Sequence, residues 1–342
     1  MKHINVSVFV PHAGCPHQCS FCNQKSISGQ SRRPTPADVE AAARTALEHS
    51  AEFAKEGEIA FFGGSFTAID REYMLSLLTA AQPFIGDNGF KGIRISTRPD
   101  AIDREICKIL KNYNVTSVEL GAQSTNDEVL RLNRRGHTRE DIFKASDLLK
   151  ECGFELGLQM MTGLYGSDDN DSIRTARDII SLKPATVRIY PTVVLKDTPL
   201  AELYRSGEYR PQTVDEAASL CAKLLVMFEV ADIKVIRLGL HSGGDVESGY
   251  IAGAYHPAFR ELCESKIYLD KISAALSDKP KGKYIIFVPP KDISKALGQK
   301  RGNMTALEER GYDCTVKADS GLSVRDIRIE ERQQSSGSPL RR

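Results

Sequence analysis

The amino-acid sequence predicts an α/β protein in which helices alternate with the strands of a parallel sheet, followed by a smaller unit near the carboxyl end. Short runs rich in β-branched residues alternate with segments whose apolar residues recur at helical spacing. This strand-and-helix unit repeats roughly every 30 residues, as in βαβ connections. The chain has 342 residues, 41% of them hydrophobic, so it can bury a full core and a small extra module.

Six strands are expected, each a short apolar run between turn-forming residues. In chain order they are Ile4–Val10, Ile59–Phe62, Gly92–Ser96, Val115–Leu120, Phe154–Met161 and Thr186–Pro191. The helices between them have a periodic apolar face, and several open with an Asp or Ser cap. In chain order these are Pro36–Ala54, Asp70–Phe84, Asp100–Asn112, Asp141–Cys152 and Ser172–Ser181. Right-handed crossovers allow either a doubly wound sheet or an incomplete barrel, and periodicity does not choose between them.

The chain beyond the sixth strand has a less regular pattern. Helices are expected at Pro199–Ser206 and Val214–Val230, and a strand at Ile233–Leu238, before a loop rich in Gly and Ser. The Pro, Gly and Lys content of residues 277–283 predicts a linker. The expected divisions are therefore a first domain at 1–276, the linker at 277–283, a small α+β module at 284–332 and a disordered tail at 333–342.

Charge is distributed unevenly along the chain. Residues 279–342 contain 14 Lys/Arg and 8 Asp/Glu, a local charge of +6, so the net charge of +1 leaves −5 for residues 1–278. A basic carboxyl end suits a nucleic-acid partner. No run approaches 18 apolar residues and the amino end lacks a signal-peptide pattern, so we expect a cytoplasmic protein that does not contact a membrane. Clustered cysteines in such a chain are candidates for metal binding, because its thiols are expected to stay reduced.

Three cysteines, Cys15, Cys19 and Cys22, form a C-x3-C-x2-C run. Structural zinc prefers four soft ligands, and the chain has no second C-x-x-C pair. His12 or His17 could supply a fourth ligand only in a strained geometry. A ferredoxin-type [4Fe–4S] cluster takes four cysteines, so three leave one iron open. An open iron is what the chemistry of S-adenosylmethionine (SAM) requires, because the amine and carboxylate of SAM chelate it.

This spacing, with the aromatic Phe21 directly before the third cysteine, resembles the signature of the radical SAM superfamily. The resemblance implies that Phe21 packs near the adenine of SAM. It also implies that the turn Gly63-Gly64 after the second strand brings its backbone close to the SAM ammonium, since glycine has no Cβ in the way. Gln123 and Arg135 would hold the SAM ribose and carboxylate, and the planar guanidinium of Arg135 suits paired hydrogen bonds.

Further candidate residues lie at or near strand ends, where barrel active sites form. Ser65, Ser96 and Gln159 are expected to contact the cofactor, although several relatives carry a glutamate at the position of Ser96. Tyr190 and Lys196, at and just after the sixth strand, are expected to act in catalysis.

Ordered phrases between about residues 4 and 275 narrow the resemblance. The phrases "FFGGSFT", "ISTRPD", "VELGAQS", "LGLQMMTGL" and "VRIYPTVVLKDTPLAELYRSGEYRP" resemble the radical SAM domain of Elongator-type catalytic subunits, which modify the wobble uridine of transfer RNA. The resemblance implies a partial (β/α)6 TIM-like barrel, a [4Fe–4S] cluster, SAM, a transfer RNA substrate and an electron donor such as flavodoxin or ferredoxin. Only some 50 ordered residues are expected after residue 283, too few for the acetyltransferase domain of that family, so use of acetyl-CoA is not expected.

The carboxyl-terminal module resembles a KH domain, an RNA-binding fold, because its expected order is strand, helix, Gly-rich turn, helix and strand. Its turn, Leu297–Met304, is similar to the I-G-x-x-G loop with which KH domains clamp phosphates, but Arg301 takes the place of the second glycine. The resemblance implies that RNA is bound by Lys295, Gly298, Lys300, Arg301 and Asn303. The alternative is a small α/β cap with a solvated basic face.

Two other functions stay open from the sequence. One is a radical SAM enzyme that acts on a small molecule, such as a porphyrinogen-type substrate. The other is a non-catalytic RNA-binding protein in which an iron–sulfur or zinc site only holds a loop together. Production of 5′-deoxyadenosine from SAM would exclude the second of these, and RNA binding that weakens with salt would argue against the first.

Overall fold

The computed structural model describes residues 5–11, 19–23, 32–87, 89–240 and 248–332. The chain divides into two compact units, of which the first comprises residues 1–217 and 224–257 and the second residues 218–223 and 258–342. None of the helices in the described ranges is both long and apolar enough to cross a membrane.

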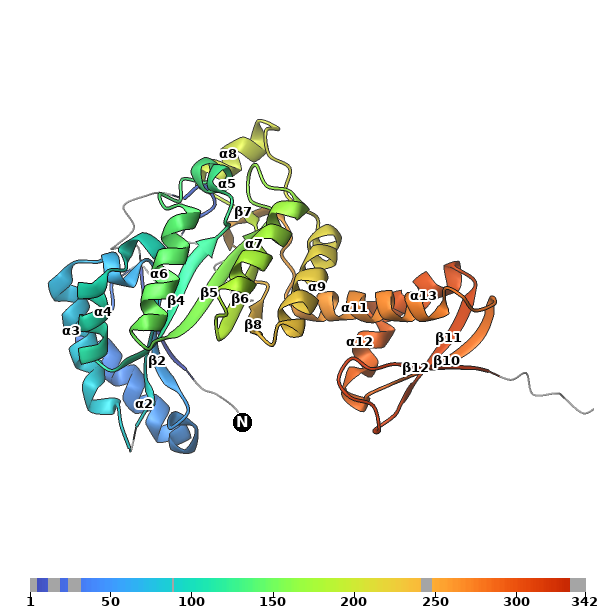
Figure 1. The fold of residues 1–342 in the computed structure, drawn as a ribbon, viewed down its shortest axis with the longest axis horizontal. Helices are drawn as coiled ribbons and strands as arrows, with labels where there is room; N and C mark the ends of the chain where they lie inside the picture. The colour runs from blue at the N-terminus through green and yellow to red at the C-terminus, as the bar shows by residue number, and fades with distance from the viewer. Residues whose placement is uncertain (1–4, 12–18, 24–31, 88, 241–247, 333–342) are drawn as a thin grey trace, which may run out of the picture. The chain divides into compact units, whose positions relative to one another are not determined.

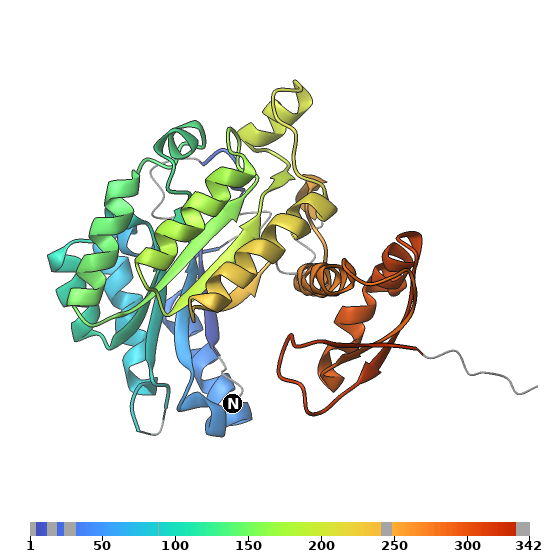
Figure 2. The same cartoon turned by 45° about the vertical axis from the view of Figure 1, so that its right-hand side comes forward.

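The first unit is built on a sheet of seven parallel strands in the order β1-β2-β3-β4-β5-β6-β8. These strands are β1 (Val6–Val10), β2 (Glu58–Gly63), β3 (Gly92–Thr97), β4 (Val115–Gln123), β5 (Glu155–Thr162), β6 (Thr186–Pro191) and β8 (Lys234–Leu238). The sheet is curled and its helices lie along one side (Figures 1 and 2), so the unit is a partial TIM-like barrel, as predicted. The predicted count of six barrel strands was wrong, because β8, expected only as a separate strand, pairs in parallel with β6 and extends the same sheet.

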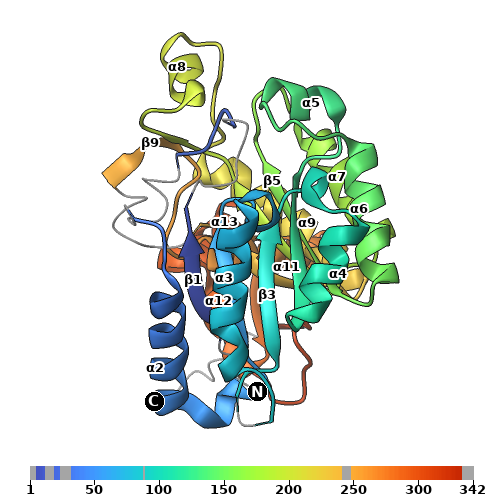
Figure 3. The ribbon, with the colours of Figure 1, turned by 90° about the vertical axis from the view of Figure 1, so that its left-hand side faces the viewer.

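The helices that connect the strands follow the predicted order. They are α2 (Pro36–Ala54), α3 (Arg71–Ala81), α4 (Arg104–Asn112), α5 (Asp127–Leu132), α6 (Arg139–Glu151), α7 (Asp169–Ser181), α8 (Pro199–Arg205) and α9 (Val214–Val230). The short helices α5 and α8 lie at the same end of the sheet as the small antiparallel pair β7 (Val193–Leu195) and β9 (Tyr250–Gly253), as Figure 3 shows together with Figure 1. The helix α5 and this strand pair were not predicted.

Several helix starts differ from the prediction because the capping residue lies earlier in the sequence. Helix α6 begins at Arg139, since Thr138 is its N-cap and Asp141, the predicted first residue, closes a capping box at the third position. Helix α7 likewise begins after Asp168, three residues before the expected start. Helix α4 begins only after Asp103, because the segment before it forms a separate 3-10 turn.

A buried ionic network lies among strands β2, β3, β4 and β5 of the first unit. Arg94 Nε donates to Glu58 Oε2 at 2.6 Å, Arg94 Nη2 donates to Glu155 Oε1 at 2.8 Å, and Ser117 Oγ donates to the other oxygen of Glu58 at 2.5 Å. Burial opposes the ionisation of Glu58, but Arg94 and Ser117, with Thr116, hold the pKa of Glu58 below its ordinary value. The interior of this half-barrel is therefore filled by paired charges as well as by apolar side chains.

The second unit contains a long helix, two short helices and a three-stranded sheet. Its elements are α11 (Phe259–Leu276), β10 (Gly282–Val288), α12 (Ile293–Leu297), α13 (Gly302–Glu309), β11 (Tyr312–Ala318) and β12 (Arg328–Glu331). The strand order is β11-β10-β12, with β10 parallel to β11 and antiparallel to β12. The predicted order of strand, helix, turn, helix and strand is confirmed, and β12 is an additional strand.

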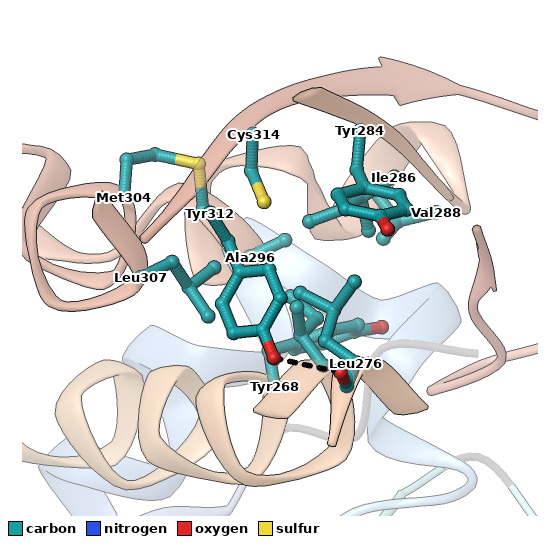
Figure 4. Close-up of a cluster of buried hydrophobic side chains, with 11 residues drawn as sticks. Tyr268, Leu276, Tyr284, Ile286, Val288, Ala296, Met304, Leu307, Tyr312 and Cys314 are labelled. Carbon is teal, nitrogen blue, oxygen red and sulfur yellow. Dashed lines mark hydrogen bonds between the residues drawn. The ribbon is translucent and has the colours of Figure 1, made fainter. Parts of the chain in front are cut away.

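The core of the second unit explains why α11 belongs to it. Tyr268, Ile272 and Leu276 of α11 join one buried cluster with side chains of β10, β11 and α13 (Figure 4). Tyr312 Oη donates to the backbone oxygen of Leu276 at 2.9 Å. By packing, residues 258–342 form the second unit together with residues 218–223. The limits 1–276, 277–283, 284–332 and 333–342 stay predictions of where the functional domains begin and end.

Candidate functional site

A cavity of about 470 Å³ opens at the carboxyl ends of strands β1 to β6 in the first unit. This is where parallel barrels place their active sites. Most of the residues predicted to bind the cluster or SAM line this one cavity, together with Tyr190; they are Cys19, Phe21, Cys22, Gly63, Gly64, Ser65, Ser96, Gln123, Arg135 and Gln159. Residues from five strands and three connecting loops thus meet in one place. The prediction for Cys15 falls outside the described residues.

The cysteine loop is fixed to the rest of the first unit through Asn133, which is fully buried just after α5. The Ser20 backbone donates to Asn133 O at 3.2 Å, and Ser20 Oγ donates to Asn133 Oδ1 at 2.6 Å. The amide of Asn133 in turn donates to the carbonyls of Val129 and Tyr165. A turn, closed by a bond of 3.2 Å from Cys22 N to Cys19 O, brings both thiols to the cavity. The structure therefore holds two of the three predicted metal ligands in place.

Arg135 lies directly beside the cysteines. Its Nη1 donates to Cys19 Sγ at 3.1 Å and its Nη2 to Gly121 O at 2.7 Å. Its Nε is buried, and no described residue accepts a hydrogen bond from it. A Cβ at Gly121 would lie 3.0 Å from Gln123 Nε2 and 3.4 Å from Arg135 Nη2, so glycine keeps this corner open. Arg135 is thus a cation next to the cysteine thiols, with one N–H donor that has no acceptor in the described part of the chain. Such a residue suits a site that holds both a thiolate-bound cluster and the carboxylate of a ligand.

The glycine pair at the end of β2 makes a close backbone contact with β1. Gly63 has φ of +120°, and a Cβ there would lie 2.5 Å from Val10 O, so no other residue fits. The next backbone N–H, of Gly64, donates to Val10 O at 3.0 Å. Ser65 lines the cavity, but its hydroxyl bonds to Thr97 Oγ1 at 2.8 Å and accepts from a backbone N–H. The observed role of the Ser65 hydroxyl is thus to join β2 to β3.

One charged pair lies on the cavity wall; the sequence indicated Arg188 as a polar candidate near the end of the sixth strand, but not its partner Glu119. Arg188 Nε donates to both carboxylate oxygens of Glu119, at 2.7 and 2.8 Å, and the guanidinium lies 5.3 Å from the ring centre of Phe62. Both Glu119 and Arg188 line the cavity. A signal was present, because a lone glutamate in the apolar run "SVELGA" of a central strand is expected to face a polar interior site.

The two predicted catalytic residues are placed differently. Tyr190 lines the cavity. The ammonium of Lys196 donates to Ser248 O at 3.2 Å, while its backbone contacts Gly249 and Asn23. Lys196 is not among the residues that line the cavity.

His137 is a buried titratable residue near this site, which the sequence analysis did not select. Its Nε2 lies 3.2 Å from Ala122 O, and it is 4% exposed. Burial and the charge of Arg135 lower the pKa of His137 to about 4. The imidazole is therefore neutral at pH 7, with Nε2–H as the donor to the carbonyl.

The turn between α12 and α13 in the second unit carries the predicted RNA-binding residues, and they divide into two groups. Lys300 and Arg301 are exposed and take left-handed backbone conformations, with φ of 51° and 63°. Lys295 instead bonds to Glu264 Oε2 at 2.8 Å and to Asp292 Oδ1 at 3.0 Å. Asn303 is buried and donates to backbone carbonyls, including Ser265 O at 2.9 Å.

The observed roles of Lys295 and Asn303 are therefore structural, because their polar groups already have partners within the unit. Gly298, with φ of 76°, packs against Asn303, and a Cβ there would lie 2.9 Å from it. Of the five predicted contacts, only Lys300 and Arg301 present their charges to solvent.

Comparison with known proteins identifies related chains. The tRNA uridine(34) acetyltransferase of Methanocaldococcus jannaschii is 34% identical over 184 residues, which are 48% of this chain and 34% of that protein. Human Elongator complex protein 3 is 27% identical over 190 residues, 50% of this chain and 35% of that protein. The solved structure of Methanocaldococcus infernus Elp3 with an N-terminal deletion has a TM-score of 0.62 at 22% identity and covers 83% of this chain and 66% of that chain.

These matches cover about a third of the length of the first curated relatives, while the structural match extends over most of the fold described above. The family models are more direct. The model of the radical SAM C-terminal domain matches residues 184–268. The model of the radical SAM superfamily matches residues 9–179, half of the chain, including the cysteine loop and strands β2 to β5 of the cavity wall. The chain therefore belongs to the radical SAM superfamily of enzymes, as its cysteine spacing predicts.

Proposed function

We propose that this chain is a [4Fe–4S] radical SAM enzyme that modifies a base of transfer RNA, the wobble uridine. The observation that carries the proposal is the convergence of Cys19, Cys22, Gln123 and Arg135 on one cavity at the carboxyl ends of the strands. The choice of RNA rests on the relatives, whose names include tRNA uridine(34) acetyltransferase.

The residues of the cavity fit a cluster and SAM. Cys15, Cys19 and Cys22 would hold the cluster. SAM would be held by the lining residues named above, namely Phe21, Gly63, Gly64, Ser65, Ser96, Gln123, Arg135 and Gln159. When bound, the cluster and SAM supply a 5′-deoxyadenosyl radical through reductive cleavage of SAM.

The chain's own residues prepare the cavity for this chemistry. Arg135 places a positive charge 3.1 Å from Cys19 Sγ, next to the thiols proposed to bind iron. Its buried Nε suits the carboxylate of SAM. Apolar side chains such as Met161, Val193 and Leu240 line another part of the cavity and exclude water, which protects a reactive intermediate from side reactions.

The size of the cavity limits how RNA reaches it. A volume of about 470 Å³ lies in the range of sites for small molecules. A cavity of this size, which SAM would also occupy, does not admit a helical segment of RNA, so the target base has to leave its stack to react. We propose that Lys300 and Arg301, exposed in the turn before α13, contribute phosphate contacts elsewhere on the RNA. The electron is proposed to come from flavodoxin or ferredoxin.

The test is anaerobic reconstitution followed by two measurements. Chromatography should detect 5′-deoxyadenosine and methionine when the reduced wild-type protein is mixed with SAM. Mass spectrometry of transfer RNA nucleosides, from cells with and without the protein, should reveal a modified uridine that depends on it. Cleavage of SAM without any RNA product would favour the small-molecule alternative. Loss of both activities in a protein that still binds RNA would favour the non-catalytic one.

Cysteine variants give this test a matched control. Cys19→Ala should abolish the cluster absorbance and SAM cleavage, because Cys19 lies in the cavity beside Arg135. Cys152→Ala should retain both, since Cys152 is the half-buried C-cap of α6 and is not among the residues that line the cavity. SAM cleavage by the Cys19 variant would show that the ligand assignment is wrong.

A further inference from the structure

The β6 side of the cavity carries positive charge that the proposed cofactor contacts do not use. Arg188 contacts Glu119 through Nε, so its two Nη groups take no part in that pair. The side chain of Arg188 is 17% exposed and that of Glu119 is 4% exposed, and both line the cavity. The Nη edge of Arg188 is therefore the part of this pair that a ligand can reach.

A second arginine stands beside the first. Arg237 of β8 is the register partner of Arg188 of β6, so the two guanidinium groups belong to neighbouring strands. Both interact with the hydroxyl of Tyr190, which lines the cavity. Arg237 Nη2 is buried, and no described residue accepts a hydrogen bond from it. Burial and the charge of Arg188 lower the pKa of Arg237, and the nearby Tyr190 only partly offsets this effect.

We propose that Arg188 and Tyr190, which line the cavity, bind an oxyanion group, a carboxylate or a phosphate, on the second substrate of the enzyme, and that Arg237, which is not among the lining residues, adds positive charge beside them. The proposal rests on the proposed function, in that a second substrate enters the cavity that also receives SAM. It assigns to these three residues a recognition role, separate from the SAM contacts expected of Gln123 and Arg135.

The charges at this corner favour an anion over a neutral group. Among the described residues, Glu119 is paired with Arg188, and the charge of Arg237 acts on the same pair from the neighbouring strand. Positive charge therefore exceeds negative charge at this corner, and an oxyanion with several lone pairs could accept from the Nη groups of Arg188. Glu119 fixes Nε of Arg188, and the ring of Phe62 lies 5.3 Å from its guanidinium, so the Nη edge is already oriented before the ligand arrives.

The test is a soak of crystals of the full chain in sodium selenate, an oxyanion that anomalous scattering locates. We expect a selenium peak within hydrogen-bond distance of Arg188 in the wild type. Arg237→Gln should need about tenfold more selenate to give the same peak, since it removes a charged donor of nearly the same size. No peak at Arg188 in the wild type, or equal peaks in wild type and variant, would overturn the proposal.

Two further variants make the comparison specific. Arg188→Gln is combined with Glu119→Gln, because the single change would leave Glu119 buried without its partner. This double variant should lose the peak. Arg104→Gln also removes one positive charge, but Arg104 is 78% exposed and paired with Glu151 at the surface, so its crystals should keep the peak. Loss of the peak in the Arg104 variant would show that only the overall charge matters.

Competition identifies the source of the oxyanion. Displacement of selenate by uridine 5′-monophosphate at a lower concentration than by acetate supports a nucleotide phosphate, and the reverse order supports the carboxylate of a small co-substrate. Displacement by neither overturns the proposal. Formation of 5′-deoxyadenosine is measured separately. A wild-type chain that cleaves SAM but has no selenate at Arg188 keeps the proposed function, whereas one that binds selenate without cleaving SAM contradicts that function.

Discussion

Lowering the pH from 7 to 5 should destabilise the first unit by about 2 kcal/mol through His137 alone. Its folded pKa is about 4, against an ordinary value of 6.5. The unfolded imidazole therefore takes up a proton below pH 6.5 that the folded one takes up only near pH 4, so stability falls as the pH falls through this window. At pH 5 the solution is about 1.5 pH units below the pKa of the unfolded imidazole and still above that of the folded one, and each unit is worth about 1.36 kcal/mol.

Two measurements check this reasoning. An NMR titration should show a histidine resonance, absent from His137→Gln, that has not shifted by pH 5 in the folded chain. Urea unfolding of the wild type and of His137→Gln at pH 7 and pH 5 should give a loss of stability about 2 kcal/mol smaller in the variant. The amide of glutamine retains a donor for Ala122 O, so the variant removes the titration and not the hydrogen bond. A ring that titrates near pH 6.5, or equal losses in both proteins, would refute the argument.

Three further predictions concern the barrel interior, the SAM site and the turn before α13. Arg94→Met should cost about 3–5 kcal/mol in urea unfolding, because it leaves Glu58 buried without its cation; a loss below about 1 kcal/mol would mean that the network relaxes. Arg135→Ala should weaken SAM binding by about tenfold or more in equilibrium dialysis while the cluster absorbance remains, and unchanged affinity would remove Arg135 from the site. Lys300→Glu combined with Arg301→Glu should weaken RNA binding and flatten its salt dependence in filter binding, with SAM cleavage as the unchanged control; equal affinity would remove the turn from the RNA interface.

Local signals predicted the strands and most of the cavity lining. The strands are short apolar runs whose period is visible in the sequence, and each predicted strand has a counterpart in the sheet. Glycine and cysteine at the strand ends also have specific local meaning. Glycine is the only residue type that fits at position 63, beside Val10 O. Cys19 belongs to a C-x3-C-x2-C spacing that few other structures require.

Features that depend on side-chain pairing across strands could not be predicted in this way. Glu119 and Arg188 are 69 residues apart and become partners only when β4, β5 and β6 lie in order. Lys295 looked like a free basic residue beside a glycine turn, but Glu264, on the preceding helix, takes its charge. Lys196 follows a cavity-lining strand in sequence, yet it is not among the lining residues, and its ammonium bonds to Ser248 O, 52 residues away. In each case the decisive partner is remote in sequence.

Asn133 holds the cysteine loop through hydrogen bonds. Part of the conformational entropy that ordering the cysteine ligands costs is therefore lost when the protein folds, before iron binds. Ser20 lies between two proposed iron ligands and is held by an asparagine that also caps the end of α5. Iron affinity and the stability of that short helix are consequently linked thermodynamically. A substitution that loosens α5 would lower the occupancy of the metal site without altering any thiol, and addition of iron and sulfide would in turn protect that helix from hydrogen exchange.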